Sequence, residues 1–403
     1  MITPPGWSSG VVGDVVTHAQ YGTSAATSAH GTRPIVGMRN LTNGNVSLKK
    51  LPFVEEGETD WAPLVLKKGD ILLNRTNSPN LVGKVGIVRE DSSAVFASYL
   101  VRLVPDLRLM IPEFLNYWLD STMVQVHLRK LATRGVSQAN INPTTFREYC
   151  PLLRPPLPEQ RKIAEILRTW DEAIEDVTKQ VDAVKKQASG MDNELFRMCH
   201  SSARNRPRDW RGFALADLCS ERTQVGSPED ELLSVSQSRG VIPQADAGRK
   251  NSSSADRSRY KLVLAGDIAY NTMRMWQGAS GVVSARGVIS PAYTVVTPDG
   301  SRLDVQYAGH LFRSRHMMFD FERYSQGLTS DTWNLKFPAF STIRIFLPPV
   351  EEQRRVSAAL DELDLARRSL ERYALALRTQ KRGLMQKLLT GDLRVQVEMD
   401  QDS

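Results

Sequence analysis

The sequence is poor in cysteine and has no hydrophobic run long enough to cross a membrane. Only three of its 403 residues are cysteines, Cys150, Cys199 and Cys219, and none of them stands in a CxxC pair. This number and spacing exclude a disulfide-stapled scaffold and favour a reducing compartment with inert thiols. The opening residues also lack the apolar segment of a signal peptide. We therefore expect a cytoplasmic protein with no membrane anchor.

Motifs that would place an active site in the chain are also missing. There is no GxxxxGK[ST] phosphate loop, and no GxGxxG opens a helix. The strings NSPN and NINPTT do not match the loop with which an adenine methyltransferase holds a flipped base. Neither Pro-Asp pair, at 105–106 or 298–299, is followed by a nearby acid-x-Lys, and the six histidines lack zinc spacing. The sequence therefore predicts no catalytic residues and no metal site.

The charge balance is the first positive feature. The 52 lysines and arginines outnumber the 45 aspartates and glutamates, which gives a formal net charge of +7. This excess favours an anionic partner, nucleic acid ahead of membrane, although a merely basic enzyme would have the same composition. A chain of 403 residues is long enough for two or three domains.

One long motif occurs twice. The string RPPLPEQRKIAEIL at 154–167 returns as LPPVEEQRRVSAAL at 347–360, 193 positions later. Other matches keep their order with a drifting offset: KKGDILLNRT at 67–76 with LAGDIAYNTM at 264–273, RGVSQANINPTTF at 134–146 with QGLTSDTWNLKFPAF at 326–340, and Trp7 with Trp210. A period of about 200 residues is too long for a solenoid, so the sequence predicts two copies of one domain.

Both copies have the composition of an α+β fold. Short β-rich runs, such as VGIVRE at 85–90 and GVVSARG at 281–287, alternate with clusters of Gly, Asn, Ser and Pro. This pattern predicts small twisted β-sheets with some helix. The clearest helix inside the first copy is expected over 111–132.

Each copy ends in a long amphipathic stretch. Apolar residues recur there in steps of four and three, which is the a/d spacing of a coiled coil. Arg367 and Lys381 interrupt the second stripe, and we expect their stems to lie along the seam while their charges reach water. The predicted seam comprises Ile163, Leu167, Trp170, Ile174, Val177, Val181 and Val184 in the first stretch and Val356, Leu360, Leu363, Leu370, Leu377, Leu384 and Leu388 in the second.

Proline, glycine and charge predict where these helices begin and end. Pro158 suits a first helical turn, and Glu159 places negative charge beside the positive end of the helix. Gly391 in LLTGD is the expected C-cap of the second helix. Gly190 lies inside the first stripe and could bend or shorten that helix.

An apolar stripe of this length must be buried against another surface. Helices of about 40 residues are about 60 Å long. We expect the two stripes to bury each other in antiparallel order, with one domain at each tip and an approximate twofold axis relating the copies. The alternative is that each helix packs onto a separate domain surface.

Basic residues interleaved with small polar ones concentrate in predicted loops of both copies. Arg and Lys suit phosphates and guanine, and Asn and Gln suit adenine. Each loop taken singly could be ordinary solvated surface, but two such sets on duplicated domains favour DNA. The candidate DNA-binding residues are Arg33, Arg39, Arg75, Asn77, Lys84, Arg134 and Gln138 in the first copy and Arg249, Lys250, Arg257, Arg259, Lys261, Arg274 and Gln277 in the second.

The order of these features resembles that of the specificity subunits of type I restriction–modification systems. The resemblance covers almost the whole chain and rests on the two Pro-Pro-x-x-Glu-Gln helix openings and the terminal LMQKLLTGDLRV. It implies target recognition domains at 1–155 and 201–347, conserved spacer helices at 156–200 and 348–391, and a C-terminal tail at 392–403. Each recognition domain would read half of a split DNA site, and the helices would fix the unread gap.

The resemblance also implies the partners. The spacer helices would help to dock methyltransferase subunits, and nuclease-translocase subunits would join that assembly. Those partners, not this non-catalytic chain, would bind S-adenosylmethionine, ATP and magnesium. Two other classes of function stay open: a methyltransferase or nuclease with an unrecognised active site, and a coiled-coil adaptor that binds proteins but not DNA.

Overall fold

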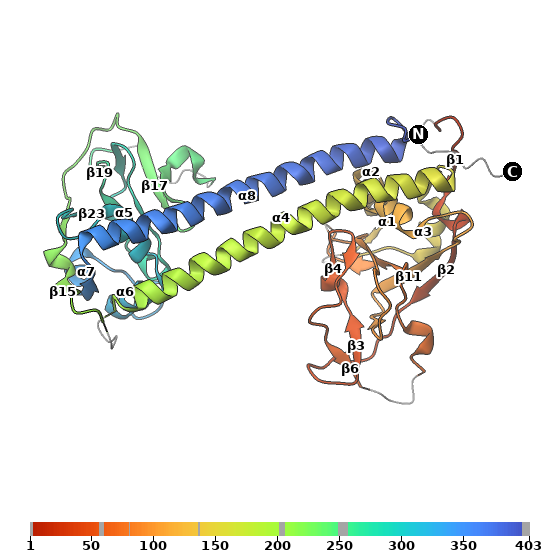
Figure 1. Ribbon diagram of the computed structural model, residues 1–403, viewed down its shortest axis with the longest axis horizontal. Coiled ribbons are helices and arrows are strands. Elements are labelled where there is room, and N and C mark those ends of the chain that lie inside the picture. Colours follow the sequence, from red (N-terminus) through yellow and green to blue (C-terminus); the bar gives the residue numbers. More distant parts are fainter. Residues whose placement is uncertain are drawn as a thin grey trace. The chain divides into compact units, whose positions relative to one another are not determined.

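The described part of the chain forms two compact units, which we treat separately (Figure 1). The computed structural model describes residues 3–55, 60–79, 81–135, 138–200, 206–248 and 257–396. The first unit contains residues 1–177 and 373–403, and the second contains residues 178–372. No helix in these described ranges has both the length and the apolar character needed to cross a membrane.

The first unit is built around a six-stranded sheet with the order β2-β11-β7-β9-β5-β4. Its strands are β2 (Val16–Tyr21), β11 (Leu100–Pro105), β7 (Ile71–Asn74), β9 (Val85–Ile87), β5 (Asn45–Val46) and β4 (Leu41–Thr42). Smaller sheets contain β10 (Val95–Phe96), β3 (Arg33–Val36) and β6 (Phe53–Val54); β12 (Thr133–Arg134), β13 (Ala139–Asn140) and β8 (Thr76–Asn77); and β1 (Ser8–Val11) with β14 (Pro151–Arg154). The helices α1 (Pro112–Asp120), α2 (Thr122–Leu131) and α3 (Pro143–Tyr149) share a core with the central sheet, in which Leu73, Val101, Phe114 and Trp118 are buried.

The second unit has two four-stranded sheets. One has the order β16-β23-β20-β21 and the other the order β18-β17-β22-β19. Their strands are β16 (Cys219–Glu221), β23 (Tyr293–Pro298), β20 (Ile268–Asn271), β21 (Ser280–Val282), β18 (Gly240–Pro243), β17 (Leu232–Ser236), β22 (Gly287–Ile289) and β19 (Lys261–Val263). A further pair joins β15 (Arg211–Ala214) to β24 (Arg344–Leu347), and the helices are α5 (Val305–Leu311), α6 (Arg315–Tyr324) and α7 (Phe337–Ser341). Short 3-10 helices include η2 (Met38–Asn40), η5 (Gln244–Ala247) and η6 (Met275–Gln277).

The two long helices are α4 (Leu157–Arg197) and α8 (Val350–Thr390), each of 41 residues. Pro158 lies in the first turn of α4, as predicted. Gly391 directly follows α8 with a φ of +76°, the left-handed conformation expected of a cap. Gly190 neither ends nor shortens α4, because the helix continues to Arg197.

The elements of the second unit repeat those of the first in the same order. α5, α6, β24 and α8 each begin 193 positions after α1, α2, β14 and α4. β20 begins 197 positions after β7, and β15 begins 203 positions after β1. These offsets equal those of the sequence matches, so the predicted duplication of an α+β domain is confirmed.

The helix predicted over 111–132 is instead two helices, α1 and α2, separated at Ser121. The backbone of Ser121 is extended, with a ψ of 146°, and its hydroxyl accepts a hydrogen bond from the amide of Val124. Ser314 caps α6 in the same way in the second unit. Apolar periodicity runs through both helices, and for that reason the pattern did not reveal the break.

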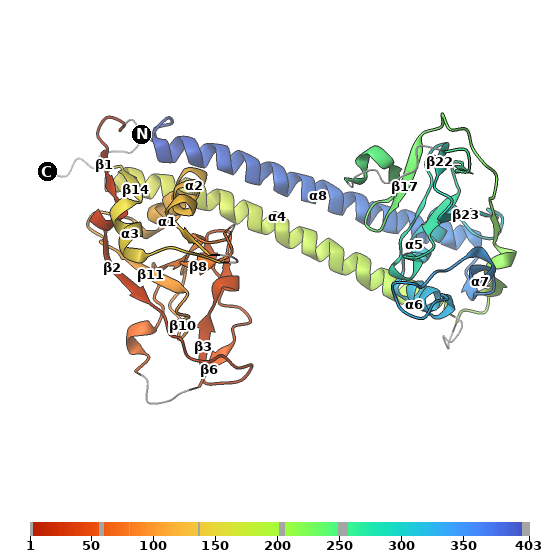
Figure 2. The ribbon, with the colours of Figure 1, turned by 180° about the vertical axis from the view of Figure 1, so that it is seen from behind.

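In each unit α4 and α8 pack side by side in opposite directions (Figures 1 and 2). In the first unit, Glu159 at the start of α4 is bonded to Arg394, beyond the end of α8. Asp171, one dozen positions further along α4, is bonded to Lys381, which comes earlier in the chain. In the second unit Lys185 of α4 pairs with Glu371 of α8 at 3.0 Å. The predicted antiparallel pairing of the helices is confirmed.

The predicted seam residues are all buried or half-buried. At its ends the seam merges with the domain cores, because Ile163 and Leu388 belong to the core of the first unit and Leu360 to that of the second. Ile174 and Leu377 are buried outside those cores, each 9% exposed. The helices therefore cover each other over the middle of the stripe, while domain surfaces cover its ends. The fully buried or nearly buried members are Ile163, Leu167, Ile174, Val177, Val181, Leu360, Leu377 and Leu388, and the half-buried ones are Trp170, Val184, Val356, Leu363, Leu370 and Leu384.

The two basic residues in the second stripe form ion pairs. The Nζ of Lys381 lies 2.6 Å from a carboxylate oxygen of Asp171, and the other oxygen accepts a hydrogen bond of 2.7 Å from the hydroxyl of Tyr117. The Lys381 side chain is only 14% exposed, so the expectation that its charge reaches water is wrong. Arg367 pairs with Asp364 and Glu371 of its own helix. Lys381 is paired because α4 places a carboxylate opposite it.

The repeated Pro-Pro-x-x-Glu-Gln motif fastens each long helix to its domain. Gln160 is fully buried, and its amide oxygen accepts a hydrogen bond of 2.8 Å from the backbone of Ile111, while its amide nitrogen donates to the carbonyls of Leu109 and Pro155. Gln353 makes the equivalent three bonds, to the backbone of Asp304, Arg302 and Pro348. A side-chain amide is suited to this position because it both donates and accepts. The motif occurs twice because each domain needs this attachment.

Among the described residues, the side chain of the motif's glutamate is hydrogen-bonded and ion-paired in the first unit alone. Glu159 is 3% exposed, accepts a hydrogen bond of 2.9 Å from the indole of Trp7 and binds the guanidinium of Arg394 through both oxygens. Within the described ranges the equivalent indole of Trp210 is buried without a hydrogen-bond partner. We call Trp7, Glu159 and Arg394 the terminal clasp, because it joins residues from both ends of the sequence.

Candidate nucleic-acid interface

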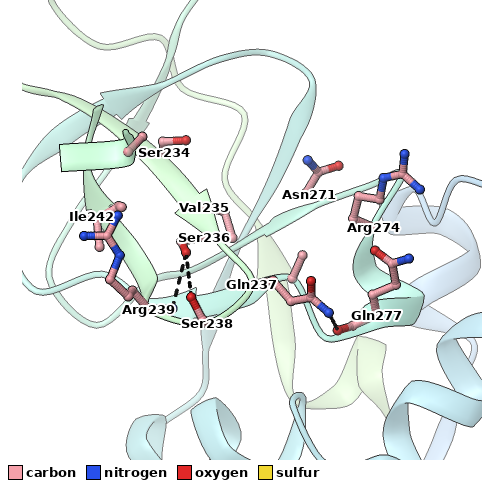
Figure 3. A pocket seen from close by; sticks show the side chains of 12 residues that line it. Ser234, Val235, Ser236, Gln237, Ser238, Arg239, Ile242, Asn271, Arg274 and Gln277 are labelled. Carbon is pink, nitrogen blue, oxygen red and sulfur yellow. Dashed lines mark hydrogen bonds between the residues drawn. The ribbon is translucent and has the colours of Figure 1, made fainter. Parts of the chain in front are cut away.

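The second unit contains a polar groove of about 660 Å³ at the turn of the β17–β18 hairpin. One wall is β17 with the turn that follows it, and the other is the segment from the end of β20 through η6 (Figure 3). None of the twelve side chains drawn in Figure 3 is acidic. The polar members are Ser234, Ser236, Gln237, Ser238, Arg239, Asn271, Arg274 and Gln277.

Two glycines let the hairpin approach its neighbour closely. Gly240 opens β18 with a φ of +72°, a conformation that side chains other than glycine rarely adopt. A β-carbon at Gly281 of β21 would lie 2.6 Å from the α-carbon of Gly240, which no real contact allows. The sequence therefore fixes the hairpin against β21, and this brings its turn beside η6.

Hydrogen bonds hold the turn in place. Gln237 donates from its amide nitrogen to the carbonyl of Gln277 at 3.0 Å, which joins the two walls. The Nη2 of Arg313 donates to the carbonyls of Gln237 and Ser238 at 3.1 and 3.3 Å. Arg239 donates to the carbonyl of Asp246. The backbone of the turn is thus fixed.

The groove has the chemistry of a surface that reads bases. Arginine donates two parallel hydrogen bonds to guanine, and asparagine or glutamine pairs with the edge of adenine. Arg274 and Arg239 supply positive charge, and no carboxylate among the lining residues opposes it. Such a surface attracts phosphates and distinguishes base edges.

Two of the residues that line this groove were predicted from the sequence. Arg274 and Gln277 were predicted and line it, whereas Gln237, Arg239 and Asn271 were not predicted. The string SQSRG at 236–240 has the same basic and polar composition as the predicted loops, and this signal could have revealed it.

The other predicted residues of the second copy lie elsewhere. Lys261 donates to the carbonyl of Tyr293 at 3.0 Å and lies 3.6 Å from the carboxylate of Glu221, so its charge is used within the fold. Arg257 is half-buried and Arg259 is exposed, both just before β19. Arg249 and Lys250 lie outside the described residues.

In the first unit, two predicted loops that are distant in sequence meet in one small sheet. β8 pairs with β13, with Asn77 opposite Ala139, and β13 pairs with β12, with Arg134 opposite Ala139. The hydroxyl of Thr76 donates to the side chain of Asn140 at 3.3 Å. This ribbon joins Asn77 to the segment of Arg134, for which only the backbone is described.

The remaining predicted residues of the first unit are placed as follows. The guanidinium of Arg75 lies 5.0 Å from the ring centre of Tyr21, and its Nε is buried with no hydrogen-bond partner among the described residues. Gln138 accepts a hydrogen bond from the amide of Gly135 through its carbonyl and is exposed. Lys84 and Arg39 are exposed, and Arg33, in β3, donates to the carbonyl of Ser93.

The described residues show no candidate metal centre and no reactive thiol. In the ranges that the structure describes, no three His, Cys, Asp or Glu side chains converge to hold a metal ion. Cys150, Cys199 and Cys219 are free and buried, and burial raises the pKa of each thiol to about 12. These thiols stay protonated at neutral pH, in agreement with the prediction that they are inert.

Comparison with known proteins identifies the family. Residues 4–185 match the family described as the type I restriction modification DNA specificity domain. A protein of Methanocaldococcus jannaschii named for the specificity subunit of type I restriction enzyme MjaX is 25% identical over 381 residues, which cover 90% of this chain and 87% of that protein. Residues 4–185 carry this domain, and the chain as a whole is similar to type I restriction enzyme specificity subunits. The prediction from the helix openings and the terminal motif is confirmed.

Solved structures share the fold of this specificity subunit. The S subunit of a type I restriction–modification system from M. genitalium aligns with a TM-score of 0.60 at 14% identity and covers 95% of this chain and 96% of its own. A chain from a type I R-M system studied for complex assembly and conformational transition aligns with a TM-score of 0.57 at 19% identity, over 98% of this chain and all of that one. The predicted fold class, with two long paired helices, is therefore confirmed.

Proposed function

We propose that this specificity subunit reads a bipartite DNA site, with one half-site contacted by each recognition domain. The observation that carries the proposal is the acid-free groove, in which Gln237, Asn271, Arg274 and Gln277 converge from two walls. In this proposal the groove reads bases of one half-site, and the β8–β13–β12 ribbon with Arg75 contributes to reading the other. Phosphate contacts would make the affinity fall with salt, and the groove side chains would choose the sequence.

The proposed role of the paired helices is to hold the two domains and to dock the partner subunits. In this proposal the long helices fix the separation of the two domains, and this separation would set the length of the unread gap. The proposed partners are methyltransferase subunits and a nuclease-translocase subunit, and these would bind S-adenosylmethionine, ATP and magnesium. A cytoplasmic location is part of the same proposal, since the proposed substrate is the DNA of the host.

Exchange of one domain tests the reading of half-sites. Residues 201–347 are replaced by the second domain of another family member, and host DNA is sequenced by a method that detects methylated bases. The expected result is a new sequence in one half of the site, with the other half and the gap unchanged. An unaltered site, or a change in both halves, would contradict the proposal.

Two matched variants test the proposed division between assembly and reading. Leu370→Asp places a charge in the half-buried seam of α8, whereas Arg75→Ala removes a side chain from the first recognition surface. Size-exclusion chromatography with the methyltransferase subunit should show impaired assembly for Leu370→Asp and normal assembly for Arg75→Ala. Equal assembly of the two variants would remove the support for a docking role of the helices.

A further inference from the structure

The loop from Gln326 to Asn334 is a closed hairpin that presents one leucine. Gln326 and Asn334 exchange backbone hydrogen bonds of 2.9 and 2.8 Å at its base. Inside it, the carbonyl of Thr329 accepts hydrogen bonds from the amide and the hydroxyl of Thr332, both 2.9 Å. These hydrogen bonds hold the backbone on both sides of Leu328.

Leu328 lies between the base of the hairpin at Gln326 and the turn that Thr329 and Thr332 close, and it is 100% exposed. The next most exposed leucines in the described part of the chain, Leu107, Leu365 and Leu375, are 64–65% exposed. A leucine that is entirely in water adds nothing to the stability of the folded chain, whereas burying it against a partner is favourable. Its position on a rigid hairpin therefore favours a role in binding.

The hairpin stands on the segment that forms one wall of the polar groove. The amide of Leu335 donates to the carbonyl of Thr272 at 2.8 Å, and the rings of Trp276 and Trp333 meet edge to face with centres 5.3 Å apart. The same short segment carries Arg274 and Gln277, which line the groove. The hairpin that carries the exposed leucine is thus anchored beside the surface to which we assign DNA binding.

We propose that Leu328 is an apolar wedge that enters the base stack of the half-site held by the groove. This inference rests on the proposed function. Architectural DNA-binding proteins insert leucine and similar side chains between base steps and kink the duplex. Unstacking costs least at flexible pyrimidine–purine steps, so the wedge would add a preference for such a step without any hydrogen bond to a base.

A base step suits Leu328 better than a protein surface does. A protein interface needs a patch of about 800 Å² on each partner with an apolar centre. The neighbours of Leu328 in the hairpin, from Thr329 to Thr332, are polar and exposed, and Asp331 is charged. One isolated apolar side chain is too little for a protein interface but is enough to separate two bases.

The test uses the full chain assembled with its methyltransferase subunit. The probe is a duplex that carries the bipartite site found by methylation sequencing, with 2-aminopurine placed in turn at each position of both half-sites. We expect fluorescence to rise on binding at one step of the second-domain half-site. Leu328→Ala should abolish that rise and weaken binding about tenfold or more, whereas Leu328→Met should keep both. Leu107→Ala, an exposed leucine of the first unit, is the matched control and should change neither.

Each other outcome has a defined meaning. If the unaltered complex binds the duplex specifically but Leu328→Ala leaves the fluorescence rise and the affinity unchanged, the wedge is disproved and the proposed function stands. If Leu328→Ala impairs assembly with the methyltransferase subunit and not DNA unstacking, the leucine contacts protein and the wedge is again disproved. If sequencing returns no methylated site that depends on this chain, the proposed function fails, and the wedge fails with it.

Discussion

The two domains carry opposite charges at one equivalent position beneath their hairpin turns. Asp120 ends α1 in the first domain, and Arg313 stands 193 positions later in the second. Arg313 donates to two carbonyls of the β17–β18 turn, whereas a carboxylate oxygen of Asp120 lies 3.6 Å from where a β-carbon of Gly44 would be, in the β4–β5 turn. The position lies beside a hairpin turn in both copies, but with a different charge.

The attachment to the long helices has changed much less. Gln160 and Gln353 make the same three bonds, and in both domains a buried aspartate, Asp70 or Asp267, accepts a hydrogen bond from the backbone three positions earlier. The comparison indicates that duplication kept the glutamine contacts between domain and helix and altered the contacts around the proposed recognition surface. Divergence of this kind is what two readers of different half-sites require.

The largest expected effect tests the equivalence of the two glutamines. Gln160→Ala and Gln353→Ala each leave one buried amide and two carbonyls without partners, at about 1–3 kcal/mol for each group. Each variant should lower the thermal midpoint of its domain by about 10 °C or more, since 1 kcal/mol corresponds to about 2–4 °C in domains of this size. Gln180→Ala, at an exposed position on α4, is the control and should leave the midpoint unchanged. Tolerance of one change but not the other would break the equivalence.

The second prediction concerns the terminal clasp, which among the described residues only the first domain has. Arg394→Ala leaves the carboxylate of Glu159 buried without its charge partner, and we expect a loss of about 2–3 kcal/mol, below the full value for a buried pair because Arg394 is 43% exposed. Glu352→Ala, at the equivalent position of the second domain, should cost less than about 0.5 kcal/mol. Urea unfolding of the single variants and of Arg394→Ala with Glu159→Leu measures both. Equal losses at Glu352 and Arg394 would refute the asymmetry.

The third prediction concerns the charge beneath the second hairpin. Arg313→Ala frees the turn that carries Gln237, and we expect about tenfold weaker binding of the assembled complex to its site, or about 1.4 kcal/mol. The loss should be confined to discrimination within one half-site, and the thermal midpoint should move by less than about 2 °C. Arg302→Ala, whose side chain is 52% exposed, serves as the control. A loss of binding that is equal for all sequences would mean that Arg313 contacts phosphate and does not position the turn.

The smallest expected effect concerns the charge beneath the first hairpin. Burial raises the pKa of Asp120 to about 6, with the charge of Asp171 adding to the shift and Lys381 opposing it. The folded state therefore holds this proton more tightly than the unfolded state, so the contribution to stability is full below about pH 4 and is lost as pH rises through 6. Asp120→Asn should raise the free energy of unfolding by about 1–2 kcal/mol at pH 8 and much less at pH 4. The exposed Asp60→Asn provides the control, and a gain that is equal at both pH values would rule out this titration.

The duplication, the long helices and the resemblance to specificity subunits were predictable from the residues alone. These follow from local periodicity, proline and glycine at helix ends, and a motif repeated at a fixed offset, all of which are present in the order of residues. The stripe from Ile163 to Val184 and the cap at Gly391 are examples, since each depends on neighbours within a few turns of helix.

The partners of the remaining polar groups became known from the folded arrangement alone. The break at Ser121, the pairing of Lys381 with Asp171 across 210 positions, and the convergence of Gln237 with Gln277 in one groove cannot be read from spacing. Composition marks such residues only as polar. The physical reason is that a hydrogen bond or ion pair acts over about 3 Å in space, and folding alone determines which distant residues come that close.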